Sequence, residues 1–360
     1  MSEIKVMIVD DSAVVRKYLS DLLTKAGVTV IGAAADPLFA MQRMKSNWPD
    51  VLVLDVEMPR MDGITFLKQV MAERPTPVVM CSTLTEKGGQ TTMQAMAAGA
   101  VGFVTKPKMG LKDFLEDDSN GIVAAVRAAA KANMSALRRA QPGIPKPGAA
   151  RAMAVAPGPQ EAMAETTDRV IAVAISTGGV QTIEAVLTRL PRTVPGMVIV
   201  QHMPPNFTAS LAARLNGLCD LEVLEAKDGD RVINGRVLFA PGGRHMRLKR
   251  SGAQYVVEVF DGPLVNHHRP NADVLLKSVA QCAGRNAIGV VMTGMGDDGS
   301  RGLREMFNAG AKTAAQDEAS CVVFGMPREA IKHGGVQQVV SLDDLPSWLM
   351  AAARSAVNAA

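Results

Sequence analysis

The chain has 360 residues, of which 48% are hydrophobic and 21% are charged, and its formal net charge is only +4. A chain of this length and composition is expected to form two or three soluble domains, each with its own buried core. The small net charge and the presence of only two Trp and two Tyr residues argue against nucleic-acid binding, which needs basic surfaces or aromatic platforms.

The sequence has the features expected of a cytoplasmic protein. An apolar strand pattern begins at Ile4, where a secreted protein would carry a signal peptide. No apolar run reaches the roughly 18 residues that a membrane span requires. The four cysteines are far apart and have no Cys-x-x-Cys spacing, so we expect reduced thiols. We therefore predict a cytoplasmic location and no direct membrane insertion.

The first part of the chain alternates short apolar runs with amphipathic stretches of helical length. This alternation predicts a doubly wound parallel sheet with helices on both faces. Five such units fit a (βα)5 domain over residues 1–132. The predicted strands are residues 4–9, 29–33, 51–54, 78–81 and 102–104.

Residues 133–168 lose this pattern. They are rich in proline, alanine and glycine, and they show no apolar period. Such a composition cannot bury enough surface to offset the entropy of ordering, so it predicts a flexible linker. The length of the linker suggests that the flanking domains move relative to each other.

A second α/β domain is predicted over residues 169–360. Apolar runs at 170–175, 197–201, 237–240 and 288–293 resemble strands of a mostly parallel sheet, with helical patterns after them. The alternation over residues 246–260 predicts an antiparallel hairpin at the edge of that sheet.

Three carboxylates follow strands of the first domain. Asp10 and Asp11 come after the first strand, and Asp55 ends the third. Because ligands bind outside the carboxyl ends of parallel strands, we expect these side chains to lie together. Three adjacent carboxylates repel one another unless a cation lies between them, and Mg²⁺ prefers such oxygen ligands. A carboxylate there can also attack phosphorus and form an acyl phosphate.

Two further polar residues fit phosphoryl chemistry. Ser82 ends the fourth strand, where its hydroxyl can bind a phosphoryl oxygen. Lys106 follows the fifth strand and precedes Pro107, whose peptide bond, if cis, would aim the ammonium inward.

In this order, the five polar residues make residues 4–125 resemble a response-regulator receiver domain. The resemblance implies that a histidine kinase phosphorylates Asp55 and that Asp10 and Asp11 help Asp55 to hold Mg²⁺. It also implies that Ser82 and Lys106 read out the phosphorylated state. Phe103 stands where the family often has a switching aromatic residue, although a plain core phenylalanine is an equal alternative.

Ser176 directly follows a predicted strand and precedes Thr-Gly-Gly and a helix. This layout projects a serine at a strand end, close to backbone N–H groups that can stabilise an oxyanion. The segment departs from the Gly-x-Ser-x-Gly pattern because Ala174 takes the first glycine position. By itself it equally fits a helix N-cap or a phosphate-binding turn.

A general base is expected among the five histidines. His202 ends the strand after that of Ser176, and adjacent parallel strands would bring the two together. The third member should be a carboxylate at another strand end, where both Asp297 and Asp298 occur. Spacing alone does not choose between them.

The other histidines are expected at the surface or in contact with substrate. They are His245, His267, His268 and His333. Among them, His267 and His268, together with Arg269, can line the mouth of the site.

Residues 168–350 resemble the catalytic domain of the chemotaxis protein-glutamate methylesterases, and the receiver and linker before them complete that family's order. The matching stretches are Ser176-Thr-Gly-Gly, Gln201-His-Met-Pro, Ala240-Pro-Gly-Gly-Arg-His-Met, His268-Arg-Pro, Thr293-Gly-Met-Gly-Asp-Asp-Gly and Ser320-Cys-Val-Val-Phe-Gly-Met-Pro-Arg-Glu-Ala. One departure is Ala174-Ile175, where the family usually has a small Gly-Ala or Gly-Ser pair.

The resemblance implies a catalytic triad of Ser176, His202 and Asp298, with Thr177 and Met295 supporting the oxyanion. It implies hydrolysis of glutamate methyl esters on chemoreceptors with release of methanol, and deamidation of receptor glutamines, with no cofactor for the hydrolase chemistry. The partners would be methyl-accepting chemoreceptors and the histidine kinase of the pathway. The unphosphorylated receiver is expected to cover the hydrolase cleft, and phosphorylation is expected to loosen that contact.

Two other classes of protein contain a receiver domain or bind receptors, and the sequence favours neither. A DNA-binding output domain would normally be small and would carry a helix-turn-helix with a basic recognition helix, whereas residues 169–360 carry several predicted parallel strands with Ser, His and Asp at their ends. A catalytically inactive receptor-binding scaffold is disfavoured because all three triad residues are present.

Overall fold

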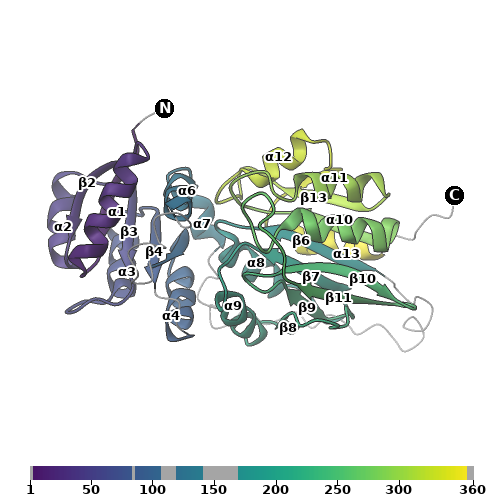
Figure 1. Cartoon of the computed structure of the whole chain (residues 1–360). Coiled ribbons are helices and arrows are strands. Elements are labelled where there is room, and N and C mark those ends of the chain that lie inside the picture. Colours follow the sequence, from purple (N-terminus) through teal and green to yellow (C-terminus); the bar gives the residue numbers. More distant parts are fainter. Residues whose placement is uncertain (1–2, 83–85, 107–118, 141–168, 355–360) are drawn as a thin grey trace, which may run out of the picture.

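The computed structural model describes residues 3–82, 86–106, 119–140 and 169–354. Two lobes lie side by side, with the N-terminal lobe in purple and blue and the C-terminal lobe from teal to yellow (Figure 1). Among the helices in these ranges, none combines the length and apolar character needed to cross a lipid bilayer.

The N-terminal lobe is built on a five-stranded parallel sheet, as the sequence predicts, and the structure gives its strand order as β2-β1-β3-β4-β5. Its strands are β1 (Lys5–Val9), β2 (Thr29–Ala34), β3 (Val51–Asp55), β4 (Val78–Ser82) and β5 (Gly102–Thr105). The apolar side chains of the central strands are buried on both faces, which explains why these strands read as continuous hydrophobic runs.

Helices surround this sheet. They are α1 (Ala13–Lys25), α2 (Pro37–Ser46), α3 (Gly63–Glu73), α4 (Glu86–Ala97) and α6 (Ser119–Ala129). The first three begin after side chains that accept a hydrogen bond from a first-turn N–H, namely Ser12, Asp36 and Asp62. These caps fix where each helix starts after its strand.

The start of the predicted linker is helical. Helix α7 (Met134–Ala140) directly follows Asn133, whose side chain accepts a hydrogen bond from the N–H of Ala136. Leu137 and Ala140 are buried. The rest of the predicted linker lies outside the described residues.

The C-terminal lobe has a seven-stranded parallel sheet in the order β14-β13-β12-β6-β7-β9-β8. Its strands are β6 (Val170–Ile175), β7 (Gly196–Gln201), β8 (Glu222–Glu225), β9 (Arg236–Phe239), β12 (Ala287–Val291), β13 (Lys312–Gln316) and β14 (Gln338–Val340). Strand β6 is central, and β7 and β12 are its direct neighbours.

Two apolar layers cover the faces of this sheet. Ile171 and Val173 of β6 pack toward α8 (Gly179–Leu187), α9 (Phe207–Asn216) and α13 (Leu345–Arg354). The alternate β6 residues, such as Ala172, pack toward the opposite layer. The elements of that layer are α10 (Ala272–Ala283), α11 (Ser300–Asn308), α12 (Met326–Lys332) and the β10–β11 hairpin.

The hairpin differs in one respect from the sequence prediction. Strands β10 (His245–Ser251) and β11 (Gln254–Phe260) are antiparallel, as expected, but they form a separate two-stranded sheet and do not extend the edge of the parallel one. Leu248 of β10 is buried, and its N–H donates to Ser278 Oγ on α10, so this helix anchors the hairpin.

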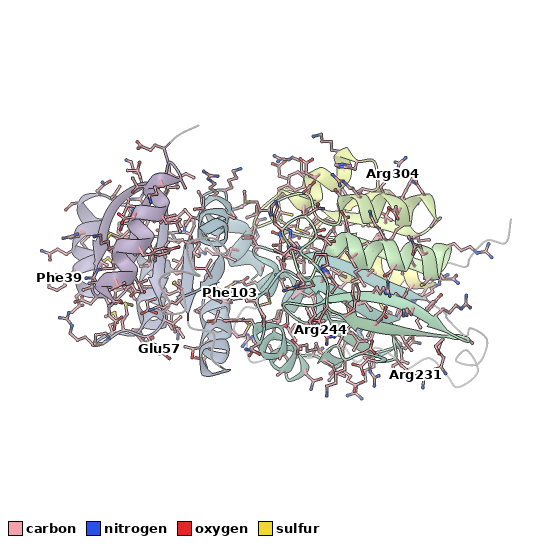
Figure 2. All side chains as sticks on the ribbon, viewed as in Figure 1. Phe39, Glu57, Phe103, Arg231, Arg244 and Arg304 are labelled. Atoms are coloured by element: carbon pink, nitrogen blue, oxygen red, sulfur yellow. The ribbon has the colours of Figure 1, made fainter. Side chains whose placement is uncertain are left out.

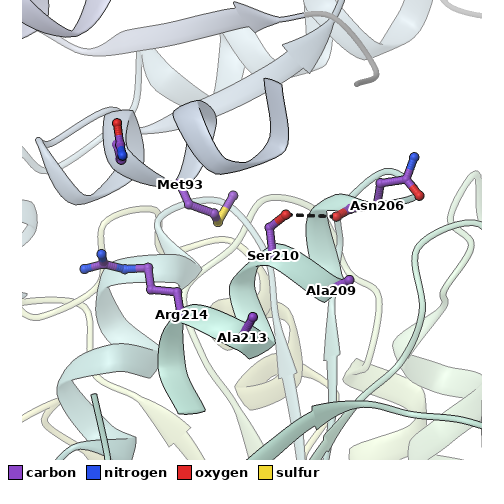
Figure 3. Close-up of a pocket in the computed structure, with 7 residues that line it drawn as sticks. Met93, Asn206, Ala209, Ser210, Ala213 and Arg214 are labelled. Atoms are coloured by element: carbon purple, nitrogen blue, oxygen red, sulfur yellow. Dashed lines mark hydrogen bonds between the residues drawn. The ribbon is translucent and has the colours of Figure 1, made fainter. Parts of the chain in front are cut away.

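The lobes contact each other through α4 and α9 and through the loop before α8. Figure 3 shows Met93 of α4 facing α9, where Ser210 and Ala213 lie. Phe103 of β5 packs on Phe207 of α9 with ring centroids 4.5 Å apart, and Figure 2 places Phe103 between the lobes. The interface is therefore formed by packed side chains from both lobes.

Candidate active site and phosphorylation site

Three carboxylates meet at the carboxyl edge of the N-terminal sheet, as the sequence predicts. One oxygen from each of Asp10, Asp11 and Asp55 lies within 4.8 Å of the others. Asp10 and Asp55 are buried and Asp11 is exposed. Lys106 Nζ lies 2.9 Å from Asp10 Oδ2 and 2.7 Å from Asp55 Oδ2. The site thus places three carboxylate groups, which can bind a metal ion, next to the ammonium group of Lys106.

Burial raises the pKa of Asp55 to about 6, although Lys106 acts in the opposite direction. Burial by itself would lower the pKa of Lys106, but its hydrogen bonds to Asp55 and Asp10 raise the pKa overall. Buried carboxylates that share one ammonium group retain unbalanced negative charge. An all-oxygen donor set of this charge fits Mg²⁺.

Of the other residues predicted for the receiver site, the structure describes Phe103 in full and Ser82 only in its backbone. Ser82 ends β4 and pairs with Thr105, but its hydroxyl and the whole of Pro107 lie outside the described parts of the chain. Phe103 is half-buried and contacts Phe207 of the other lobe, so it is not enclosed in the core of its own domain.

Ser176 lies directly after β6 in a turn fixed by three groups. Its N–H donates to Thr293 O at 2.9 Å. Its carbonyl oxygen accepts from the N–H of Gly179 at 2.8 Å and from Gln201 Nε2 at 3.0 Å. Gly178 adopts a left-handed φ of 76°, and a Cβ there would lie 2.4 Å from Cβ of Val322. Only glycine fits at this position of the turn.

His202 follows the neighbouring strand at the same level of the sheet, because Ile175 of β6 pairs with Gln201 of β7. Its Nε2 lies 2.7 Å from Asp298 Oδ2. Its Nδ1 is buried and has no hydrogen-bond partner among the described residues. A carboxylate accepts hydrogen bonds only, so Nε2 carries the proton and Nδ1 carries the lone pair.

Asp298 is enclosed by donors. Its Oδ1 accepts from Asn271 Nδ2 at 2.7 Å and from the N–H of Asp273 at 3.0 Å. Its Oδ2 accepts from the N–H of Ala272 at 2.7 Å as well as from His202. Burial alone would raise the pKa of Asp298. The interaction with His202 and the hydrogen bonds from these N–H groups outweigh burial, so the pKa is lowered overall. The carboxylate is therefore anionic and fixed at the start of α10.

The neighbouring Asp297 is exposed and has no comparable contacts. Of the two aspartates between which spacing could not choose, Asp298 is the one that contacts His202.

Atoms of His202, His268 and Asp298 also lie within 4.8 Å of one another, a spacing that suits a metal ion. Both oxygens of Asp298 already accept two hydrogen bonds each. This saturation favours orientation of the imidazole over metal ligation.

Ser176 and His202 border a cavity of about 620 Å³ between the lobes. Thr177 and Met295, the residues predicted to support an oxyanion, also line it. Residues of β5 and α6 close its other side, among them Phe103 and Ala125. The receiver thus covers the opening above the serine.

Gln201 is a site residue that sequence reasoning missed. It is buried, and its Nε2 donates to the carbonyl oxygens of both Ser176 and His202. A Cβ on Gly179 would lie 2.1 Å from its Oε1 and 2.7 Å from Cγ1 of Ile175. The bulky Ile175 is accommodated because a glycine faces it. The sequence signals for Gln201 are its place beside His202 and its occurrence in the family-matching stretch Gln201-His-Met-Pro, and neither indicates what its side chain contacts.

The predictions for the histidines other than His202 are only partly correct. The prediction of a surface or substrate-contacting role is wrong for His245, which is only 1% exposed and whose Nε2 lies 2.9 Å from the carbonyl oxygen of Pro263. His267 and His268 line the cavity with Arg269, as predicted. His268 does more than line it, because its ring stacks on that of His202.

Comparison with known proteins finds matches over both lobes of the chain. Residues 6–116 match the response regulator receiver domain, and residues 171–349 match the CheB methylesterase family. A protein-glutamate methylesterase/protein-glutamine glutaminase of Albidiferax ferrireducens is 60% identical over 346 residues, which are 96% of this chain and 99% of the relative. The chain belongs to the CheB methylesterase family.

Other members agree with this assignment. A protein of the same name from Dechloromonas aromatica is 60% identical over 98% of this chain and 99% of its own. The crystal structure of the Thermotoga maritima CheB methylesterase catalytic domain is 36% identical, with a TM-score of 0.50, and the match covers 51% of this chain and 97% of that one. The family therefore accounts for the seven-stranded lobe as well as for the motifs.

Proposed function

We propose that this protein hydrolyses glutamate methyl esters on chemoreceptors, deamidates receptor glutamines, and is activated by phosphorylation of Asp55. The observation that carries the proposal is the pairing of His202 with Asp298, which leaves Nδ1 without a partner beside a cavity that Ser176 lines. The names of relatives at 60% identity supply the substrate class.

Ser176 is the proposed nucleophile. Its Oγ attacks the ester carbonyl carbon while His202 Nδ1 takes the hydroxyl proton, and Asp298 stabilises the imidazolium that forms. Backbone N–H groups near Thr177 and Met295 stabilise the oxyanion. Methanol leaves with the proton from His202, and an acyl-enzyme remains.

Water then completes the reaction. His202 accepts a proton from water, which attacks the acyl carbon, and Ser176 leaves with the proton returned to it. The product is a free glutamate side chain. With a glutamine substrate the same steps release ammonia in place of methanol.

Asp55 is the proposed phosphoacceptor, and Asp10, Asp11 and Asp55 would hold Mg²⁺. The ion, when bound, offsets the negative charge that a phosphoryl group brings to these carboxylates. Lys106 contacts Asp10 and Asp55, so it is placed to exchange a carboxylate contact for a phosphoryl oxygen. Such an exchange alters the end of β5, which carries Phe103 at the interface.

Both parts of the proposal are tested by methanol release from methylated receptor membranes, with and without a small phosphodonor and Mg²⁺. We expect release by the wild type to rise with phosphodonor, and release by Asp55→Asn to stay at the basal level. Release that rises equally in both proteins would exclude Asp55 as the acceptor. No release in any condition would favour a receptor-binding output without catalysis.

The contact between lobes predicts a second, separable effect. Gln181 of α8 is buried, and its Nε2 donates to the carbonyl oxygens of Met96, at 2.5 Å, and Ala100, at 2.8 Å, in the receiver. Gln181→Leu leaves both carbonyls unpaired in the closed arrangement, at a cost of about 1–3 kcal/mol. Basal methanol release without phosphodonor should therefore rise roughly tenfold.

Gln94→Leu is the matched control. Gln94 is exposed on α4 and borders the α4–α9 pocket, drawn in Figure 3, without a hydrogen bond across the interface. Its basal rate should stay close to that of the wild type. An unchanged rate in Gln181→Leu would mean that these hydrogen bonds do not hold the receiver over the cleft.

A further inference from the structure

The ring of His268 lies face to face with the ring of His202. The ring centroids are 4.0 Å apart, and the planes are inclined by only 17°. Both rings line the cavity that contains Ser176. His268 therefore contacts a face of the proposed base and not the ring edge that carries its nitrogens.

His202 has few hydrogen bonds that could set the plane of its ring. Its ring has one hydrogen bond, from Nε2 to Asp298, and Nδ1 has none within the described residues. One hydrogen bond fixes one atom of a ring but not the plane of the ring. A flat group against one face restricts the remaining tilt, so that Nδ1 stays directed at its target.

The loop that presents His268 is tied to the same carboxylate. Val265 and His268 exchange two backbone hydrogen bonds of 3.1 and 2.9 Å across a tight turn. The two residues inside the turn have left-handed φ angles, 47° for Asn266 and 63° for His267, which non-glycine residues rarely adopt.

Asn271 holds this turn against the site. Its Nδ2 donates to the carbonyl oxygen of Val265 at 3.0 Å and to Asp298 Oδ1 at 2.7 Å. One amide group therefore links the turn that carries His268 to the carboxylate that orients His202, which the N–H groups of Ala272 and Asp273 also hold.

The charge state of His268 suits a stacking role. Burial, followed by the proximity of His202, lowers the pKa of His268 to about 4, so the ring is neutral at pH 7. A neutral ring can remain on His202 when His202 becomes an imidazolium, because the cation is attracted to a π face. A protonated His268 would repel that imidazolium.

We propose that His268 is a positioning residue, whose ring holds the plane of His202 so that Nδ1 faces Ser176. This role rests on the proposed function of Ser176 and His202. It requires a flat ring at position 268, and the stacking contact itself does not involve the ring nitrogens.

The test compares His268→Phe, which keeps a flat ring without nitrogens, with His268→Ala, which removes the ring. In the full chain activated by phosphodonor and Mg²⁺, His268→Ala should lower kcat by roughly 10- to 100-fold and leave KM within about threefold. His268→Phe should stay within about threefold of the wild-type kcat. Equal losses in both variants, or no loss in either, would overturn the proposal.

A second measurement needs no substrate and separates this proposal from the proposed function. In protein labelled with ¹⁵N-histidine, the proton shared by His202 Nε2 and Asp298 is assigned by its absence in His202→Gln. It should be sharp in the wild type and in His268→Phe, and broadened by solvent exchange in His268→Ala. An equally sharp signal in His268→Ala would refute the positioning role even if the protein hydrolysed no ester.

Discussion

Ser176→Ala should reduce methanol release by roughly 10⁵- to 10⁶-fold, because removal of a serine nucleophile leaves only the oxyanion donors and substrate binding to act on the ester. The turn around Ser176 is held by backbone hydrogen bonds to Thr293, Gly179 and Gln201, none of which uses the hydroxyl group. The variant should therefore fold normally and bind receptor with unchanged affinity. Methanol release and receptor co-sedimentation, measured on one preparation, separate the two effects.

Ser251→Ala is a suitable control because Ser251 is exposed at the end of β10, away from the cavity. It should keep full activity. A Ser176→Ala protein with more than about one per cent of wild-type activity would require a different nucleophile or direct attack by water.

The sequence predicted the elements whose apolar runs are buried on both faces. β6 and β7 have every residue buried, and they stood out as uninterrupted hydrophobic stretches. β13 (Lys312–Gln316) was missed because Lys312, Thr313 and Gln316 break the apolar pattern. These polar residues are satisfied within the fold: Gln316 Oε1, for example, accepts from the N–H of Thr293. Such partners are tertiary and leave no local signal.

In the candidate site, too, local sequence patterns could be read from the sequence and tertiary contacts could not. Strand ends revealed Ser176, His202 and Asp55, because each lies at or directly after the end of a predominantly apolar strand. For Gln201 the sequence assigned no role, and for His268 it predicted a place at the mouth of the site but not the stacking on His202, because these contacts are made with backbone carbonyls or with a ring from elsewhere in the chain. The choice between adjacent aspartates likewise depends on which side chain turns toward α10, and no spacing encodes that.

Asp298→Asn should lower kcat by roughly 10³- to 10⁴-fold, because it removes the charge that stabilises the His202 imidazolium and disturbs the tautomer. If the amide NH₂ takes the place of Oδ2, it faces the N–H of Ala272 and forces His202 to present a lone pair at Nε2. Nδ1 is then protonated and cannot take the proton from Ser176.

The opposite orientation of the amide in Asp298→Asn also destabilises the fold. With NH₂ in place of Oδ1, it faces the donors Asn271 Nδ2 and the N–H of Asp273. Either orientation leaves buried donors unpaired, so the free energy of unfolding should fall by about 1–3 kcal/mol. Thermal unfolding and methanol release should therefore both report the change.

Asp297→Asn provides the comparison, because it makes the same chemical change at the exposed neighbouring position. We expect its kcat within about twofold of the wild type and its unfolding midpoint unchanged. If Asp297→Asn proved the more damaging substitution, the carboxylate that orients His202 during turnover would be Asp297, and the loop after β12 would have to rearrange when substrate binds. If only Asp298→Asn is impaired, the arrangement of His202, Asp298 and α10 described here is the one that acts in catalysis.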